Sequence, residues 1–196
     1  MLNVVPAIEI RRKLIHIFLG AAIITGIYTH TITVFHLFLL LAFGVFLSFI
    51  MVRWNIPLVS KMLDLCERKH SHPGKGAITF VIGCILALKL FPMDIALAAI
   101  VVLSIGDGIS TIVGIAIGRT KTILSEVKLL EGTIIGIVLA SIGAWLFVPL
   151  WQAIIASTVA MGLEATELKL NNKILSDNIL VPLTAGTAIL LLRMYV

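Results

Sequence analysis

Long apolar segments, separated by short polar ones, follow one another along the whole chain. A helix needs roughly 17–25 apolar residues to cross a bilayer, and seven segments come close to that length. The segments are Leu14–His30, Thr31–Val52, Gly76–Phe91, Ile95–Gly118, Gly132–Val148, Pro149–Leu163 and Ile179–Tyr195. The pattern predicts an all-α fold: a polytopic membrane bundle of about seven transmembrane helices, forming one integral-membrane domain over residues 1–196.

The composition agrees with a membrane protein. Hydrophobic residues make up 60% of the chain and charged residues 13%, and the mean hydropathy of +1.14 excludes an ordinary soluble domain. The two cysteines, Cys66 and Cys84, have no metal-ligand spacing. They predict neither a disulfide framework nor a zinc site.

The basic residues predict the orientation of the bundle. If the N-terminus is cytoplasmic, 13 of the 15 lysines and arginines lie on the cytoplasmic side, and only Lys89 and Arg193 lie opposite. This is the bias that the positive-inside rule expects, and an odd number of spans then places the C-terminus outside. Nine of the ten carboxylates fall on the same side, Asp94 being the exception. Because acidic residues contribute little to topology, we expect the chemistry of the protein at the cytoplasmic face.

Three polar segments connect the helices on that side, at residues 53–75, 119–131 and 164–178. In the first, apolar residues at positions 58, 59, 62, 63 and 66 predict a short helix lying in the membrane interface. The segment ends in Gly74-Lys75-Gly76, whose backbone N–H groups and ammonium can hold a phosphate. A flexible turn before a helix is the alternative interpretation.

Asp107 is the most informative single residue, because it lies inside the fourth apolar segment. A carboxylate at that depth costs roughly 2.5–3.5 kcal/mol on insertion scales, so it needs a partner or a function. Gly106 and Gly108 flank it, which predicts a break in the helix where the carboxylate meets water. Small residues recur every four positions in this segment and in the next, a pattern typical of close helix packing. Asp107 is adjacent to that stripe and is therefore expected to face the interior.

The remaining polar residues have two interpretations each. Glu131 opens the fifth helix and either caps it or belongs to a site. Arg119, Lys121 and Lys128 either set the topology or bind phosphates. Ser176 or Asp177 can be an N-cap of the last helix.

Taken in order, these motifs resemble the CTP-dependent polyprenol kinase family, which includes dolichol kinases, phytol kinases and CTP-dependent diacylglycerol kinases. The resemblance covers nearly the whole chain, and Leu129-Leu130 departs from the small polar residue found in some members. The matching residues are Arg12-Lys13-Leu14-Ile15-His16, Pro73-Gly74-Lys75-Gly76, Gly106-Asp107, Gly114, Gly118-Arg119, Lys128, Glu131-Gly132-Thr133, Glu164, Asp177-Asn178 and Pro182. The chain looks like a short prokaryotic member of the family, in the plasma membrane.

The resemblance implies a kinase that transfers the γ-phosphate of CTP to the hydroxyl of a membrane isoprenoid alcohol, with Mg²⁺ as cofactor. Asp107 and Glu131 are the expected catalytic residues, with Asp107 acting either as a base or as a metal ligand. The expected metal ligands are Asp107, Glu131, Glu164 and Asp177. The expected nucleotide-binding residues are Lys75, Gly106, Gly118, Arg119, Lys121, Lys128, Gly132 and Asn178. Further candidates for the site are Arg12, Lys13 and His16.

Two other functions compete with the kinase. A cytidylyltransferase acting on a lipid phosphate would use the same carboxylates and Mg²⁺ but attack the α-phosphorus, and its dense C-terminal signature is missing here. A small transporter or scaffold would predict polar residues along several spans. In this chain the charges are gathered at one face. We expect a nucleoside triphosphate, a lipid alcohol and the bilayer as partners and no nucleic acid. The alcohol and the oligomeric state are left open.

Overall fold

The computed structural model describes residues 4–53, 73–120, 129–166, 169–170, 173–174 and 176–195. The helices are α1 (Val4–Tyr28), α2 (Val34–Arg53), α4 (Lys75–Leu90), α5 (Met93–Val101), the π-helix η1 (Val102–Asp107), α6 (Gly108–Ile117), α7 (Leu130–Ala144), α8 (Leu150–Glu164) and α9 (Asp177–Tyr195). Two short antiparallel strands, β1 (Lys169–Leu170) and β2 (Lys173–Ile174), lie between α8 and α9.

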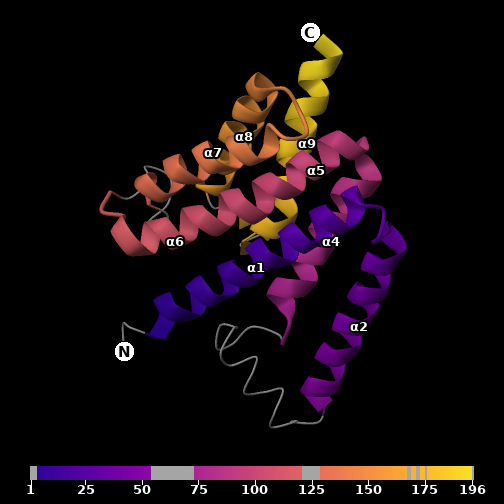
Figure 1. Ribbon diagram of the computed structural model, residues 1–196. Coiled ribbons are helices and arrows are strands. Elements are labelled where there is room, and N and C mark those ends of the chain that lie inside the picture. Colours follow the sequence, from indigo (N-terminus) through magenta and orange to yellow (C-terminus); the bar gives the residue numbers. More distant parts are fainter. Residues whose placement is uncertain are drawn as a thin grey trace.

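The predicted all-α fold is confirmed. The elements α5, η1 and α6 continue one another as a single helix, so each of the seven predicted apolar segments contains one helix (Figure 1). The interfacial helix predicted within residues 53–75 lies outside the described residues. So do residues 121–128 of the second polar segment and residues 167–168, 171–172 and 175 of the third.

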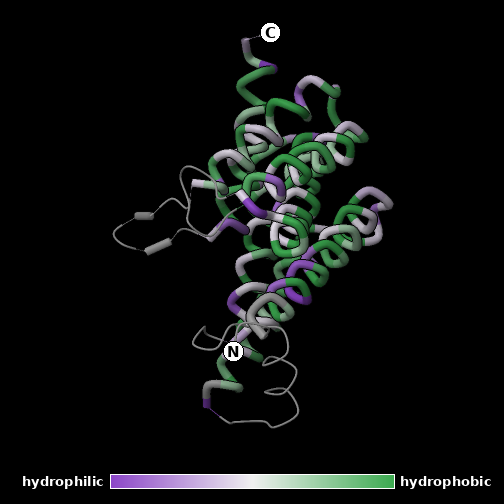
Figure 2. The backbone as a smooth tube through the Cα atoms, turned by 90° about the vertical axis from the view of Figure 1, so that its left-hand side faces the viewer, coloured by the Kyte–Doolittle hydropathy of each residue, from purple (hydrophilic) through white to green (hydrophobic). Residues whose placement is uncertain are grey.

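Three of the described helices are long and apolar enough to cross a membrane: Val34–Met51 within α2, Met93–Ile117, and α9. The helices α7 and α8 are also apolar but shorter. Large apolar side chains cover the outside of the bundle, and Phe18 and Phe49 are 71% and 69% exposed. Most of the chain is correspondingly hydrophobic in Figure 2, with short hydrophilic segments. These surfaces are compatible with association with a lipid bilayer; seven spans and the orientation of the termini stay predictions.

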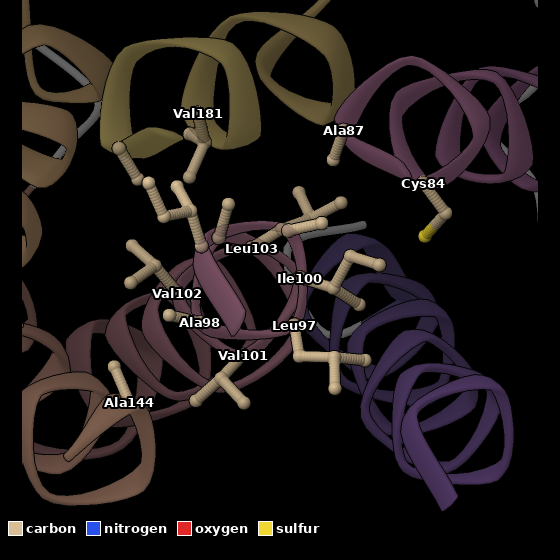
Figure 3. Packing of buried hydrophobic residues seen from close by; sticks show 14 of the residues in the cluster. Cys84, Ala87, Leu97, Ala98, Ile100, Val101, Val102, Leu103, Ala144 and Val181 are labelled. Carbon is tan, nitrogen blue, oxygen red and sulfur yellow. The ribbon is translucent and has the colours of Figure 1, made fainter. Parts of the chain in front are cut away.

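The helix formed by α5, η1 and α6 is the centre of the bundle. Every residue from Ile95 to Ser104 is buried, because this stretch is hydrophobic on all of its faces. Its side chains point outward to α4, α7 and α9, where they meet residues such as Ala87, Ala144 and Val181 (Figure 3). The packing of α5 and η1 on all sides fixes the position of Asp107 at the end of η1.

The break predicted at Gly106 and Gly108 is wrong. The helix widens to a π-turn over Val102–Asp107 and resumes as α6, with Gly108 in ordinary right-handed helical conformation. Asp107 is 1% exposed, so its predicted inward orientation is confirmed although it does not meet bulk water. Wide turns of this kind are rare and frequently occur at functional sites.

Candidate functional site

Three carboxylates meet at the central helix: one belongs to it, and the other two come from α8 and α9. Asp107 is the last residue of η1, Glu164 the last of α8 and Asp177 the first of α9. Each offers a carboxylate oxygen, and these three atoms lie within 4.8 Å of one another. Asp107 and Glu164 are buried and Asp177 is half-buried. Helix ends thus bring together residues that are 70 positions apart in the chain.

Lys13 reaches this cluster from α1. Its Nζ donates to Oδ1 of Asp107 at 2.6 Å and to Oδ2 at 2.5 Å, and both side chains are almost completely buried. The approach of α1 depends on Gly108, where an added Cβ would lie against the side chain of Ile17 and 3.7 Å from the carbonyl oxygen of Lys13. Glycine at position 108 therefore serves the contact between α1 and the central helix.

The same face of α1 carries three further polar residues, spaced three or four residues apart. Arg12 forms an ion pair with Glu9 at 2.8 Å. The His16 ring stacks on Phe80 of α4 with ring centroids 4.7 Å apart. Its Nδ1 is buried and has no hydrogen-bond partner among the described residues. Of the three candidates on α1, Lys13 therefore contacts the carboxylate cluster. Arg12 and His16 lie on the same face of the helix, and Glu9 is paired with Arg12.

The first turn of α4 is tied to the first turn of α9 at this site. Nδ2 of Asn178 donates to the carbonyl oxygen of Gly76 at 3.1 Å and to Oγ1 of Thr79 at 2.8 Å. Gly74 precedes the helix with a φ of 77°, a left-handed conformation that glycine adopts without strain. Lys75 is the first residue of α4 and its side chain is exposed. Asn178 thus positions the backbone of the predicted phosphate-binding turn.

Glu131 does not belong to the carboxylate cluster. Its oxygens accept the backbone N–H of Thr120 at 3.0 and 3.3 Å, which ties the segment after α6 to the start of α7. Hydrogen bonds from its own backbone N–H and from Thr120 lower the pKa of Glu131 below its usual range. Of the four predicted metal ligands, three come together and Glu131 is separate. The nearby Arg119 is exposed, and Lys121 and Lys128 lie outside the described residues.

Three of the glycines predicted to bind nucleotide lie where the helices pack closely together. A Cβ on Gly132 would collide with the carbonyl oxygen of Ser110 and lie 2.9 Å from the amide nitrogen of Gly114. A Cβ on Gly106 would lie 2.8 Å from the sulfur of Met161. At Gly118, a Cβ would lie 2.6–2.8 Å from side-chain atoms of Leu129. The close approach of α6 to α7 confirms the small-residue packing expected from the sequence, and it leaves Gly106 and Gly132 buried.

An apolar cavity of about 250 Å³ lies between α2 and α4. Leu19 closes it from α1, and Ser48 at its rim donates to the carbonyl oxygen of Pro73 at 2.6 Å. Gly74 and Ala77 also line it, so its wall begins at the turn that contains Lys75. The cavity therefore borders the polar site along the first turns of α4.

The three clustered carboxylates have the chemistry of a magnesium site. Mg²⁺ prefers one or two protein carboxylates, with phosphate oxygens and water completing its shell. Asp107, Glu164 and Asp177 supply oxygens at a suitable separation. The residues present fit a divalent metal.

Comparison with known proteins gives one relative. An uncharacterized protein of Methanocaldococcus jannaschii is 35% identical over 115 residues, which is 58% of this chain and 59% of that protein. The chain thus spans about three fifths of the length of the curated relative that it matches. No protein-family model matches the chain, and no solved structure matches it.

Proposed function

We propose that the protein is a membrane-bound lipid kinase that transfers the γ-phosphate of CTP to the hydroxyl of an isoprenoid alcohol at the cytoplasmic face. The observation that carries this proposal is the meeting of Asp107, Glu164 and Asp177 with Lys13 in one buried cluster. Phosphoryl transfer needs positioning and neutralisation of charge more than covalent chemistry, and carboxylates that hold a metal beside cationic side chains supply both.

The roles of the side chains follow from their positions. Asp107, Glu164 and Asp177 would hold Mg²⁺, which neutralises phosphate charge when bound. Lys13 and Arg12 on α1 are near enough to the cluster to pair with phosphate oxygens. Lys75 lies at the start of α4, where the backbone N–H groups of a helix terminus favour an anion. The nucleotide would thus be held between α1 and α4.

The acceptor is proposed to bind from the side of α2. The cavity between α2 and α4 is almost wholly apolar and borders the turn at Gly74, which suits the hydrocarbon tail of an alcohol whose hydroxyl lies near Lys75. In the reaction, the alcohol oxygen forms a bond to the γ-phosphorus, and the bond from that phosphorus to the β,γ-bridging oxygen breaks. CDP leaves, and the hydroxyl proton passes to a carboxylate oxygen that does not bind the metal, for which the second oxygen of Asp107 is our candidate.

Purified protein with CTP labelled separately at the α- or γ-phosphorus tests the proposal. Isoprenoid alcohols and diacylglycerol are offered as acceptors, and the corresponding lipid phosphates are offered in parallel. We expect γ-label in lipid from an alcohol, and we expect Asp107→Asn to abolish it while the protein still inserts and folds. α-Label from a lipid phosphate would instead identify a cytidylyltransferase. Label in neither product would refute both enzyme functions for these substrates and favour a transporter or scaffold.

A further inference from the structure

Lys13 occupies the place of a cation among the three carboxylates. Its ammonium lies 2.5 and 2.6 Å from the two oxygens of Asp107, and the residue is 3% exposed. One oxygen of Asp107 at the same time lies within 4.8 Å of oxygens of Glu164 and Asp177. The group thus contains three carboxylates and one ammonium, and carboxylate oxygens are ligands that a divalent cation prefers.

A metal ion and the Lys13 ammonium would compete for the same oxygens. Mg²⁺ binds oxygen ligands at roughly 2.0–2.1 Å, so a metal on an oxygen that the ammonium also contacts would lie within roughly 5 Å of that ammonium. Cations at that separation repel one another strongly in a buried site, where water screens them weakly. The two cations therefore cannot both hold Asp107 as Lys13 does here.

The ring of His16 lies beside this pair, and one of its nitrogens lacks a hydrogen-bond partner within the described part of the chain. Nδ1 of His16 is buried without a hydrogen bond, and the charges of both Lys13 and Asp107 act on this ring. His16 lies one turn from Lys13 on the same face of α1. Its free nitrogen can accept a hydrogen bond from a displaced ammonium or make one to a bound ligand.

We propose that Lys13 is the resident counter-ion of the carboxylate cluster and that a divalent metal displaces it from Asp107. The ammonium released by this exchange remains on α1, beside the space where phosphates would bind, and can pair with them. The inference rests on the proposed function for the identity of the metal site, but it does not depend on phosphoryl transfer. It predicts that Lys13 weakens metal binding while being needed for activity.

The first test is the affinity of the full-length protein in detergent for Mn²⁺, measured by electron paramagnetic resonance of the free ion. Removing the competing ammonium with Lys13→Met should tighten Mn²⁺ binding by about tenfold or more, which corresponds to about 1.4 kcal/mol. Arg11→Met is the matched control, because it removes one positive charge from an exposed position on the same helix. The control should change the affinity less than about twofold, since exposed charges are screened. Equal or weaker Mn²⁺ binding by Lys13→Met, relative to wild type, would overturn the exchange.

The second test uses the wild-type protein and does not depend on how the variant folds. Lys13 should react slowly with a small amine-directed reagent in EDTA and faster with Mn²⁺, because the metal releases its ammonium. Modification is measured by mass spectrometry of the peptide that contains Lys13, with the exposed Lys75 as an internal reference. Unchanged or slower modification of Lys13 in Mn²⁺ would contradict the displacement.

The outcomes separate this inference from the proposed function. Tighter Mn²⁺ binding in Lys13→Met without any transfer of γ-label would support the exchange and refute the kinase. Transfer of γ-label with no gain in affinity would leave the kinase standing and refute the exchange. No Mn²⁺ binding by either protein would refute the metal site on these carboxylates and the exchange with it.

Discussion

The buried pair of Lys13 and Asp107 allows a quantitative test of what holds α1 against the central helix. The perturbation is a double-mutant cycle with Lys13→Met, Asp107→Asn and the double variant, all in EDTA. Each single change leaves one charge buried without its partner, since the two residues are only 3% and 1% exposed. Breaking one side of such a pair destabilises a protein by about 3–5 kcal/mol.

In the double variant, the free energy of unfolding should fall by much less than the sum of the decreases caused by the two single changes. It replaces the ion pair by a thioether and an amide, so neither member of the pair keeps its charge after losing the other. Contacts at 2.5 and 2.6 Å make the residues direct neighbours, and we expect a coupling energy of about 2–3 kcal/mol. The free energy of unfolding is measured by denaturant titration in micelles, followed by circular dichroism. If the effect of the double variant equals the sum of the two single effects within about 0.5 kcal/mol, the two residues are not energetically coupled and the reasoning is refuted.

Three further predictions concern other contacts between the helices. Gly132→Val should lower the free energy of unfolding by about 1–3 kcal/mol because its side chain would meet the Ser110 carbonyl. Gly162→Ala, with open space around it, is the control: it should not lower the thermal unfolding temperature, since alanine is favoured over glycine in a helix. Asn178→Ala removes two hydrogen bonds at the start of α4. It should lower the free energy of unfolding by about 1–3 kcal/mol and raise the Michaelis constant for CTP; an unchanged Michaelis constant would show that this turn is not part of the nucleotide site. Arg193→Gln breaks a half-exposed ion pair with Asp94 at the opposite end of α9 and should lower the free energy of unfolding by at most about 1 kcal/mol. Transfer of γ-label should not change, so a loss of transfer would contradict the location of the site.

The sequence predicts the helices and much of the carboxylate cluster correctly, because both depend on strong local signals. Apolar segments of nearly membrane-spanning length can bury their backbone polar groups only as helices. Glu164 and Asp177 are recognisable because polar residues next to such segments mark helix ends. Asp107 is recognisable because a charge inside an apolar helix is rare. Their meeting within 4.8 Å depends on tertiary packing that no local pattern contains.

The errors have physical reasons as well. Flanking glycines predicted a break at Asp107, but the surrounding helices pack the chain tightly there and it widens to a π-turn instead. The role of Gly132 in nucleotide binding stays a prediction; the structure places this glycine where two helix backbones touch, a position that also requires a small residue. Glu9 was missed as a neighbour of the site. The signal was available in its spacing from Arg12, Lys13 and His16, which places all four on one helical face.

The geometry divides the polar residues into two regions along α6. From Asp107 to the end of the helix at Ile117 are ten residues, or about 15 Å of helix. The carboxylate cluster lies at one end of that distance, and Glu131 with the segment at Arg119 and Thr120 lies at the other. Under the proposed function, the reacting phosphates belong at the cluster, because that is where the metal-binding oxygens and the buried ammonium are. The segment after α6 would then contact the outer part of the nucleotide or the lipid headgroups. Substitutions in that segment should therefore change the affinity for the nucleotide or the lipid, whereas substitutions at Asp107 should slow the chemical step.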